Sequence, residues 1–355
     1  MSNIKKTQAA MQNAGLNALL ITERLDRLYV LDFHSTDGAV LILRDKVYFV
    51  TDSRYIESAR ERITDAIVIM STNEKSQNTT LKEILAENSI TELGAQDEAL
   101  SYSTFLSTAE KLEVKLIPSK GIIRGLRETK ERYEVDYILA AQRIAEAAFD
   151  YVLGLIKPGI TERDIAAELD YRMAKNGAEG FSFKTISLAG ANGSHPHGAP
   201  SNYKLQKGDF VTLDFGCRLG GYCSDMTRTV ALGSVSDEMR RVYDIVLNAQ
   251  LAALDAVRVG MTGTQLDKVA RDIITKEGYG EYFGHGLGHG IGLNVHENPR
   301  VSPRGVREIP EHAVLTIEPG IYLPGRFGVR IEDMIYLTDS GPENLTNTPK
   351  DLIIL

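Results

Sequence analysis

The first 120 residues combine two hydrophobic periodicities. Apolar residues recur at helical spacing in three segments, residues 4–13, 81–87 and 103–112. Short apolar runs, typical of buried strands, lie between and after them at residues 18–21, 38–43, 47–51, 92–95 and 114–117. Two of these runs flank the polar turn at 44–46 and predict a β-hairpin. Strands that alternate with helices indicate a compact α/β domain.

A long charged helix is predicted next, from Glu128 to Ile156. Pro158 and Gly159 follow it and would stop any further helical turn. The alternating pattern ends before this helix, near residues 122–127. We therefore predict an N-terminal α/β domain over residues 1–123 and a second domain over residues 124–355.

The second domain contains an internal repeat. The segment 159–177 begins with Gly-Ile-Thr and recurs 101 residues later as 260–278, which begins with Gly-Met-Thr. The strand-like segment 211–216 is echoed by 315–320. Each half thus predicts helix, Gly-Thr turn, helix, loop and a β-hairpin that opens with an acidic residue. Such a duplication places two equivalent hairpins about a pseudo-twofold axis, where a cleft is a natural site.

The first hairpin brings two carboxylates together. If Gly220 and Gly221 form a two-residue turn, residue 216 lies opposite Asp225. Side chains alternate between the faces of a strand, so Asp214 then shares a face with Asp225. Their backbones would be diagonal neighbours about 7–8 Å apart. A three-residue turn would put the two side chains on opposite faces.

The second half supplies another acidic pair, Glu318 and Glu332. Four carboxylates in one cleft must be protonated or neutralised, and two divalent cations carry the matching charge. Five of the seven histidines lie nearby in glycine-rich segments, at positions 195, 197, 285, 289 and 296. Four carboxylates with one histidine suit Mn²⁺ and tolerate Co²⁺, Fe²⁺ or Zn²⁺. Two such ions can ionise a water for hydrolysis at neutral pH.

Composition excludes several classes of protein. Hydrophobic content of 43% and charged content of 25% are typical of a globular chain. The longest apolar runs have five residues, whereas a membrane helix needs about 20. A net charge of −8 argues against nucleic acid or an anionic membrane as partner. No secretory signal precedes the chain's first helix, and only Cys217 and Cys223 are present, so we expect a soluble cytoplasmic protein.

Five motifs carry a family resemblance. They are Asp214-Phe215-Gly216, the run 222–229, the run 285–297, Glu318-Pro319-Gly320 and the run 330–333. In this order and spacing they resemble the pita-bread metallopeptidases, and among these the Xaa-Pro dipeptidases (prolidases) and Xaa-Pro aminopeptidases. The resemblance covers the full chain. It implies a mixed α/β (α+β) protein with a creatinase/prolidase-type N-terminal domain and a pita-bread catalytic domain.

The resemblance also implies roles for individual residues. The metal ligands it implies are Asp214, Asp225, His289, Glu318 and Glu332. Asp225 and Glu332 would bridge the two ions, and Glu318 would be the general base for the bridging water. The substrate-site residues it implies are His197, His285, His296, Arg330 and Arg304, with His197 and His296 also assigned to catalysis. Arg304 resembles an arginine that holds the product carboxylate in prolidases, whereas His195 is interpreted as structural.

The predicted function is hydrolysis of the bond between an N-terminal residue and proline, with a homodimer implied by the resemblance. Dipeptides and longer Xaa-Pro peptides both remain candidate substrates. The alternatives are a metal-free binding or scaffold protein, a creatinase-like amidinohydrolase and a methionine aminopeptidase. No predicted ligand is lost, which argues against a metal-free relative. The N-terminal domain argues against a simple methionine aminopeptidase.

Overall fold

The chain divides after Arg127 into two compact units in the computed structural model, which describes residues 2–355. The first unit ends with helix α6 (Ile122–Arg127), four residues beyond the boundary expected from the sequence. Among residues 2–355, no helix combines the length and the apolar character needed to cross a membrane.

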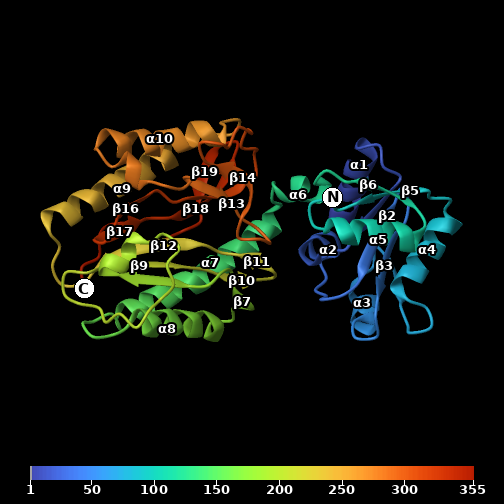
Figure 1. Cartoon of the computed structure of the whole chain (residues 1–355), viewed down its shortest axis with the longest axis horizontal. Helices are drawn as coiled ribbons and strands as arrows, with labels where there is room; N and C mark the ends of the chain where they lie inside the picture. Colours follow the sequence, from blue (N-terminus) through green and yellow to red (C-terminus); the bar gives the residue numbers. More distant parts are fainter. Residues whose placement is uncertain (1) are drawn as a thin grey trace. The chain divides into compact units, whose positions relative to one another are not determined.

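The first unit is an α/β domain built on one mixed sheet (Figure 1). Its strands follow the order β4-β3-β2-β1-β5-β6. They are β1 (Ala18–Ile21), β2 (Ala39–Leu43), β3 (Val47–Thr51), β4 (Ile67–Met70), β5 (Glu92–Ala95) and β6 (Lys115–Pro118). Its other helices are α1 (Asn3–Asn13), α2 (Arg24–Leu31), α3 (Ile56–Arg62), α4 (Gln77–Glu87) and α5 (Tyr102–Leu112). The central strands β1 and β2 are buried at every position, as their unbroken apolar runs predict.

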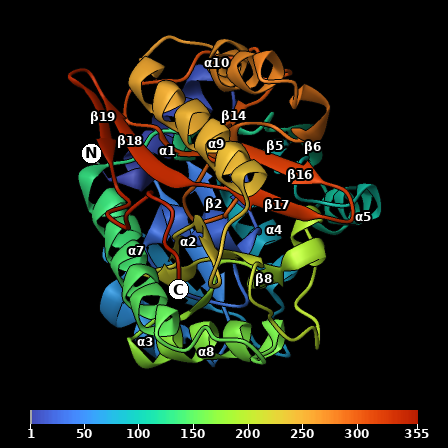
Figure 2. The ribbon, with the colours of Figure 1, turned by 90° about the vertical axis from the view of Figure 1, so that its left-hand side faces the viewer.

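The second unit places its strands between two pairs of helices. Figures 1 and 2 show α9 (Asp237–Ala256) and α10 (Gly263–Lys276) on one side of the strands. The helices α7 (Arg132–Leu153) and α8 (Glu162–Lys175) lie on the other side. Each pair packs on its own apolar core, and the amphipathic helices bury their apolar faces there.

The strands of the second unit form several small sheets. Those of the first half are β7 (Gly180–Phe181), β8 (Ile186–Ala189), β9 (Phe210–Phe215), β10 (Cys217–Leu219), β11 (Tyr222–Cys223) and β12 (Met226–Ala231), ordered β12-β9-β8 and β11-β10-β7. Those of the second half are β13 (Gly288–Gly290), β14 (Glu297–Val301), β15 (Val314–Ile317), β16 (Gly320–Leu323), β17 (Phe327–Arg330), β18 (Asp333–Thr338) and β19 (Gly341–Asn344), ordered β14-β13-β15-β18-β19 and β16-β17. Two short 3₁₀ helices, η1 (Gly190–Ser194) and η2 (Gly280–Tyr282), interrupt the loops.

The internal repeat is visible at the start of α8 and α10. Both helices have 14 residues, and each is capped by a threonine, Thr161 or Thr262. Both threonines take part in a capping box with the side chain three positions later, which satisfies exposed N–H groups of the first turn. Gly159 and Gly260, two residues before each cap, have positive φ values of 93° and 80°. The repeated Gly-x-Thr sequence therefore encodes the same helix entry twice.

The first hairpin has the predicted register. Gly220 and Gly221 form a two-residue turn with φ values of 57° and 82°, as a type I′ turn requires. The pairs around it are Leu219–Tyr222, Arg218–Cys223, Phe215–Met226 and Asp214–Thr227. One register runs through all four pairs, so Asp214 and Asp225 share a face. The prediction that rested on turn length is confirmed.

The second hairpin differs from the first in one respect. Its flanking pairs are Ile317–Asp333 and Gly320–Arg330, which share one register. Glu318 and Glu332 therefore lie directly opposite each other, whereas Asp214 and Asp225 are diagonal neighbours. The acidic residues of the two halves correspond in order along the chain, but the hairpin registers are not identical.

Candidate metal centre

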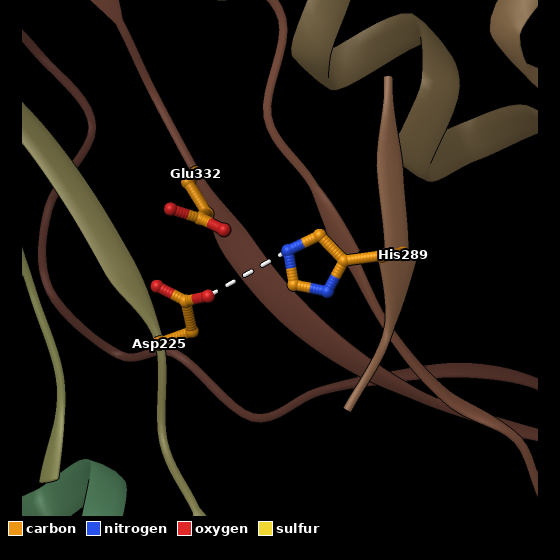
Figure 3. A group of neighbouring side chains, drawn as sticks. All are labelled: Asp225, His289 and Glu332. Carbon is orange, nitrogen blue, oxygen red and sulfur yellow. Dashed lines mark ion pairs between the residues drawn. The ribbon is translucent and has the colours of Figure 1, made fainter. Parts of the chain in front are cut away.

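Three side chains from separate segments converge in the second unit. Asp225 precedes β12, Glu332 lies between β17 and β18, and His289 is the middle residue of β13. Their side chains point toward one another, with His289 Nε2 3.7 Å from Asp225 Oδ2 (Figure 3). One potential ligand atom from each lies within 4.8 Å of the others. A carboxylate–imidazole–carboxylate group of this size can hold a divalent cation.

The other two predicted ligands lie next to this group. Glu318 Oε1 is 3.3 Å from His289 Nε2 and accepts a hydrogen bond from Thr316 Oγ1 at 3.3 Å. Asp214 lies close enough to the same centre for its negative charge to raise the pKa of Asp225. All five residues that the sequence analysis proposed as ligands are thus brought to one place.

Four ionised carboxylates this close together are electrostatically unfavourable without a cation. Burial, followed by the negative charges of its neighbours, raises the pKa of Asp225 and of Glu332 well above the usual values. Burial also raises the pKa of Asp214, although Arg330 opposes this. Burial alone would raise the pKa of Glu318 too, but the hydrogen bond and charge of His289 lower it to about 2. Bound cations would stabilise the ionised form of all these carboxylates.

The hydrogen-bonding pattern fits bound metal. Within residues 2–355, Asp214 Oδ1 and Glu332 Oε1 are buried oxygens without a hydrogen-bond partner. Buried polar atoms normally have partners, so two orphaned carboxylate oxygens in one site need an explanation. The donor set is oxygen-rich with one imidazole, which matches hard to borderline divalent ions. The residues present therefore fit the metal that the sequence pattern implies.

The orientation of His289 is also that of a ligand. Its Nδ1 lies 3.1 Å from the carbonyl oxygen of Gly290, which can only accept a hydrogen bond. Nδ1 must carry a proton, so Nε2 is the nitrogen that faces the carboxylate cluster. Nε2 donates to Glu318 while the ring is protonated, and it offers a lone pair to a metal ion once that proton leaves. A backbone carbonyl thus selects the tautomer that a metal ion needs.

A chain of hydrogen bonds begins at Asp214 and extends through three further side chains. Arg330 pairs with Asp214 and donates to Tyr322 Oη at 2.7 Å. Tyr322 donates to His285 Nε2 at 2.9 Å, and His285 Nδ1 donates to the carbonyl of Gly286 at 2.8 Å. Burial lowers the pKa of His285, so this imidazole is neutral, and burial raises the pKa of Tyr322 to about 12. Arg330 is committed to Asp214 and Tyr322, and its predicted contact with substrate stays a prediction.

Three supporting residues escaped the sequence analysis. Thr227 donates to Glu332 Oε2 at 2.7 Å and accepts from Arg330 Nε at 3.1 Å. Thr316 contacts Glu318 and accepts from the His289 amide at 3.2 Å. Thr227 carried a usable signal, because it lies two residues after Asp225. Tyr322 carried none, since a tyrosine in a buried strand is usually a packing residue.

The remaining predicted histidines lie in different settings. His296 packs edge-on against His289, with ring centroids 4.3 Å apart. His197 is close enough to Asp214 and His285 to interact electrostatically with both. His195 is exposed, and its Nδ1 lies 3.2 Å from the carbonyl of Asn192 in the same turn. This local contact agrees with a structural role for His195.

Arg304 lies on an exposed loop between β14 and β15. Its backbone N–H donates to Ser302 Oγ at 3.3 Å. Its guanidinium makes no hydrogen bond or ion pair with the described part of the chain, so it remains available to a ligand.

Comparison with known proteins identifies the class. Residues 136–339 match metallopeptidase family M24, and residues 3–129 match the creatinase/prolidase N-terminal domain. The chain belongs to metallopeptidase family M24. It is 38% identical to an uncharacterized peptidase of Bacillus subtilis over 99% of both chains.

Two solved structures are also similar. An Xaa-Pro dipeptidase from Bacillus anthracis shares 40% identity, with a TM-score of 0.96 over 99% of both chains. An X-Pro aminopeptidase from Thermotoga maritima shares 38% identity, with a TM-score of 0.92 over 98% of this chain and 100% of that one. The family and fold predictions are confirmed, and these comparisons give no support to a metal-free or amidinohydrolase relative.

Proposed function

We propose that this protein is a metal-dependent exopeptidase that hydrolyses the bond between an N-terminal residue and proline. The observation that carries the proposal is the convergence of Asp225, His289 and Glu332, with an orphaned oxygen on Glu332. Family membership and the two Xaa-Pro peptidase structures support the choice of substrate. A dedicated site suits this bond, because proline lacks the N–H that an extended substrate would donate.

We propose two divalent ions, held by Asp214, Asp225, His289, Glu318 and Glu332. When bound, such ions lower the pKa of water and polarise a carbonyl oxygen. The oxygen-rich donors favour Mn²⁺, with Co²⁺, Fe²⁺ or Zn²⁺ as substitutes.

The protein's own groups have distinct tasks in this proposal. Although burial opposes it, the hydrogen bond and charge of His289 lower the pKa of Glu318 and keep its carboxylate ionised, and we assign this carboxylate as the general base for the attacking water. His296 lies beside His289 and would donate a hydrogen bond to the scissile carbonyl or support proton transfer. His197, His285 and Arg330 would form the wall that receives the substrate.

Arg304 supports a preference for dipeptides. Its exposed and uncommitted guanidinium could pair with the carboxylate that follows proline in a dipeptide. In a tripeptide that carboxylate is replaced by an amide, which gains less from a positive charge. We therefore propose Xaa-Pro dipeptides as the preferred substrates.

The decisive assay compares two substrates. Release of free proline from an Xaa-Pro dipeptide and of the first residue from an Xaa-Pro-Yaa tripeptide are measured with Mn²⁺ and again after chelation. We expect metal-dependent cleavage that favours the dipeptide. Cleavage of neither substrate by metal-loaded protein would refute the proposed function, and a preference for the tripeptide would refute the dipeptidase assignment.

The role of Arg304 has its own test. Arg304→Ala should lower kcat/KM for the dipeptide by about 10- to 100-fold, mainly through KM, because a charge-assisted hydrogen bond is lost. The control is Arg307→Ala, on the same loop. The guanidinium of Arg307 already pairs with Glu128 at 2.7 Å. Equal effects of the two substitutions would contradict carboxylate binding by Arg304.

A homodimer and a cytoplasmic location complete the proposal. Both cysteines are buried and form no disulfide in the described part of the chain, which agrees with a reducing compartment. The chain mass is 39.1 kDa, so sedimentation would give about twice this value for the dimer. A mass equal to one chain would refute it.

A further inference from the structure

Lys130 is buried at the start of the second unit. Its side chain is 0% exposed, and its ammonium donates to Glu297 Oε2 at 3.2 Å. The Glu297 side chain is itself only 7% exposed. Removing two charges from water is costly, and a buried ion pair seldom adds net stability. The pair therefore calls for an explanation other than stability.

Glu297 connects this lysine to a turn of the proposed site. Its other oxygen, Oε1, accepts a hydrogen bond from the Asn294 amide at 2.9 Å. The Glu297 carboxylate thus connects the two ends of the turn 294–297, and His296 lies within that turn. His296 is the residue that packs against the predicted ligand His289. The carboxylate that Lys130 neutralises is therefore the one that fixes the backbone beside His296.

Gly292 leaves room for this arrangement. A Cβ atom at position 292 would lie 2.7 Å from Glu297 Oε2 and 3.0 Å from Lys130 Cε. The same glycine accepts a hydrogen bond from the Cys223 amide at 2.8 Å, two residues before Asp225. The segment that carries His296 is thus tied to the first hairpin as well as to Lys130.

The geometry points to Lys130 and Glu297 as positioning residues for His296. The ammonium holds the carboxylate, the carboxylate holds the 294–297 turn, and the turn places the imidazole beside His289. Because His296 would act on the scissile carbonyl, loosening the turn lowers kcat more than it changes KM. The expected change in kcat rests on the proposed function, because kcat is measured with an Xaa-Pro substrate.

Two variants test the inference by different routes. K130M/E297L replaces the ion pair by apolar side chains, which preserves packing while removing the acceptor for the Asn294 amide. G292A keeps both charges and displaces the carboxylate sterically, so it tests the same contact if the double variant does not fold. The control is G154A, because the nearest atom to a Cβ there is 3.5 Å away and φ is −70°.

We expect kcat on an Xaa-Pro dipeptide to fall by about 10-fold or more in both variants, as a small misplacement of a reacting group causes. KM, the bound metal and the thermal midpoint of G292A should stay close to those of the wild type. G154A should match the wild type throughout. Wild-type kcat in folded K130M/E297L or G292A would overturn the inference, as would a loss explained wholly by lost metal or lost folded protein.

A second readout separates this inference from the proposed function. In Zn²⁺-loaded protein, the ¹H–¹³C signal of the His296 ring, assigned with H296Q, should move in both variants and stay in place in G154A. If the wild type cleaves no Xaa-Pro substrate, the proposed function fails but this shift still supports the positioning role. An unmoved His296 signal in both variants refutes that role whatever the activity.

Discussion

Glu318 and Glu332 are the same residue type in the same site, yet the pKa values of their carboxyl groups move in opposite directions. Burial raises the pKa of Glu332, and the neighbouring negative charges add to this effect. Burial would also raise the pKa of Glu318, but His289 donates a hydrogen bond to it and brings that pKa to about 2. The partner, rather than the residue type, decides the direction in which the pKa of each carboxyl group moves.

Thr227 allows a sharp test at this scale. Thr227→Val preserves shape but removes the hydroxyl that donates to Glu332 and accepts from Arg330. We expect metal affinity or kcat to fall by about 10- to 100-fold, as is usual when a group that orients a ligand is lost. Chelator competition and steady-state assays measure the two quantities.

The matched control is Thr212→Val. Thr212 is also buried and shares a hydrogen bond of 3.0 Å with Thr229 on the neighbouring strand. Its loss should cost about 1 kcal/mol of unfolding free energy and leave metal affinity unchanged. If the two valine variants had equal metal affinities and equal kcat values, Thr227 would not orient Glu332.

At the scale of elements, the first turn of α8 holds the loop that contains His197, which we proposed as a substrate residue. Glu162 begins this helix and is completely buried. Its carboxylate accepts hydrogen bonds from the Ala189 amide at 2.7 Å, Asn192 Nδ2 at 3.0 Å and both the amide and hydroxyl of Ser201, at 2.8 and 2.6 Å. One side chain thereby fixes both ends of the segment 189–201, which contains His197.

Glu162→Gln should loosen this segment. The amide nitrogen of glutamine would face hydrogen-bond donors, so we expect unfolding free energy to fall by about 1–3 kcal/mol. Urea unfolding measures the loss, and hydrogen exchange should become faster within residues 189–201.

Glu168→Gln is the control on the same helix. Glu168 pairs with Arg172 one turn away and is partly exposed, so its change should stay within about 0.5 kcal/mol. Unchanged exchange of 189–201 in Glu162→Gln would contradict the role of Glu162.

For the whole molecule, the metal centre links stability to pH. In metal-free protein the pKa values of Asp225 and Glu332 are raised, so the folded chain binds more protons than the unfolded chain above about pH 4. Its unfolding free energy should therefore fall as pH rises through the raised pKa values. Metal ions displace these protons, and metal affinity should increase over the same range.

Calorimetric melting of metal-free and Mn²⁺-loaded protein checks this linkage. We expect the difference in melting temperature to widen from about pH 5 to about pH 8. The double variant D225N/E332Q should lose most of the pH dependence in its metal-free form, because neither side chain then titrates. A constant difference across this range would contradict the linkage.

The sequence by itself determined the features that depend on local geometry. The period of two along a strand, with Gly220 and Gly221 as the turn, placed Asp214 and Asp225 on one face. The repeated Gly-x-Thr entries to α8 and α10 marked the duplication. These signals need only neighbouring residues, and the resemblance to a known family assigned the ligands among them.

Only the tertiary structure decided which faces meet and what each charge touches. His289 reaches Asp225 from a different strand, and Tyr322 links Arg330 to His285 across the second hairpin. The pKa shifts and the buried partner of Lys130 likewise depend on burial and on contacts between distant segments. Periodicity shows which side of an element is apolar, but the packing of the two halves sets the distances, and distance determines electrostatics and hydrogen bonding.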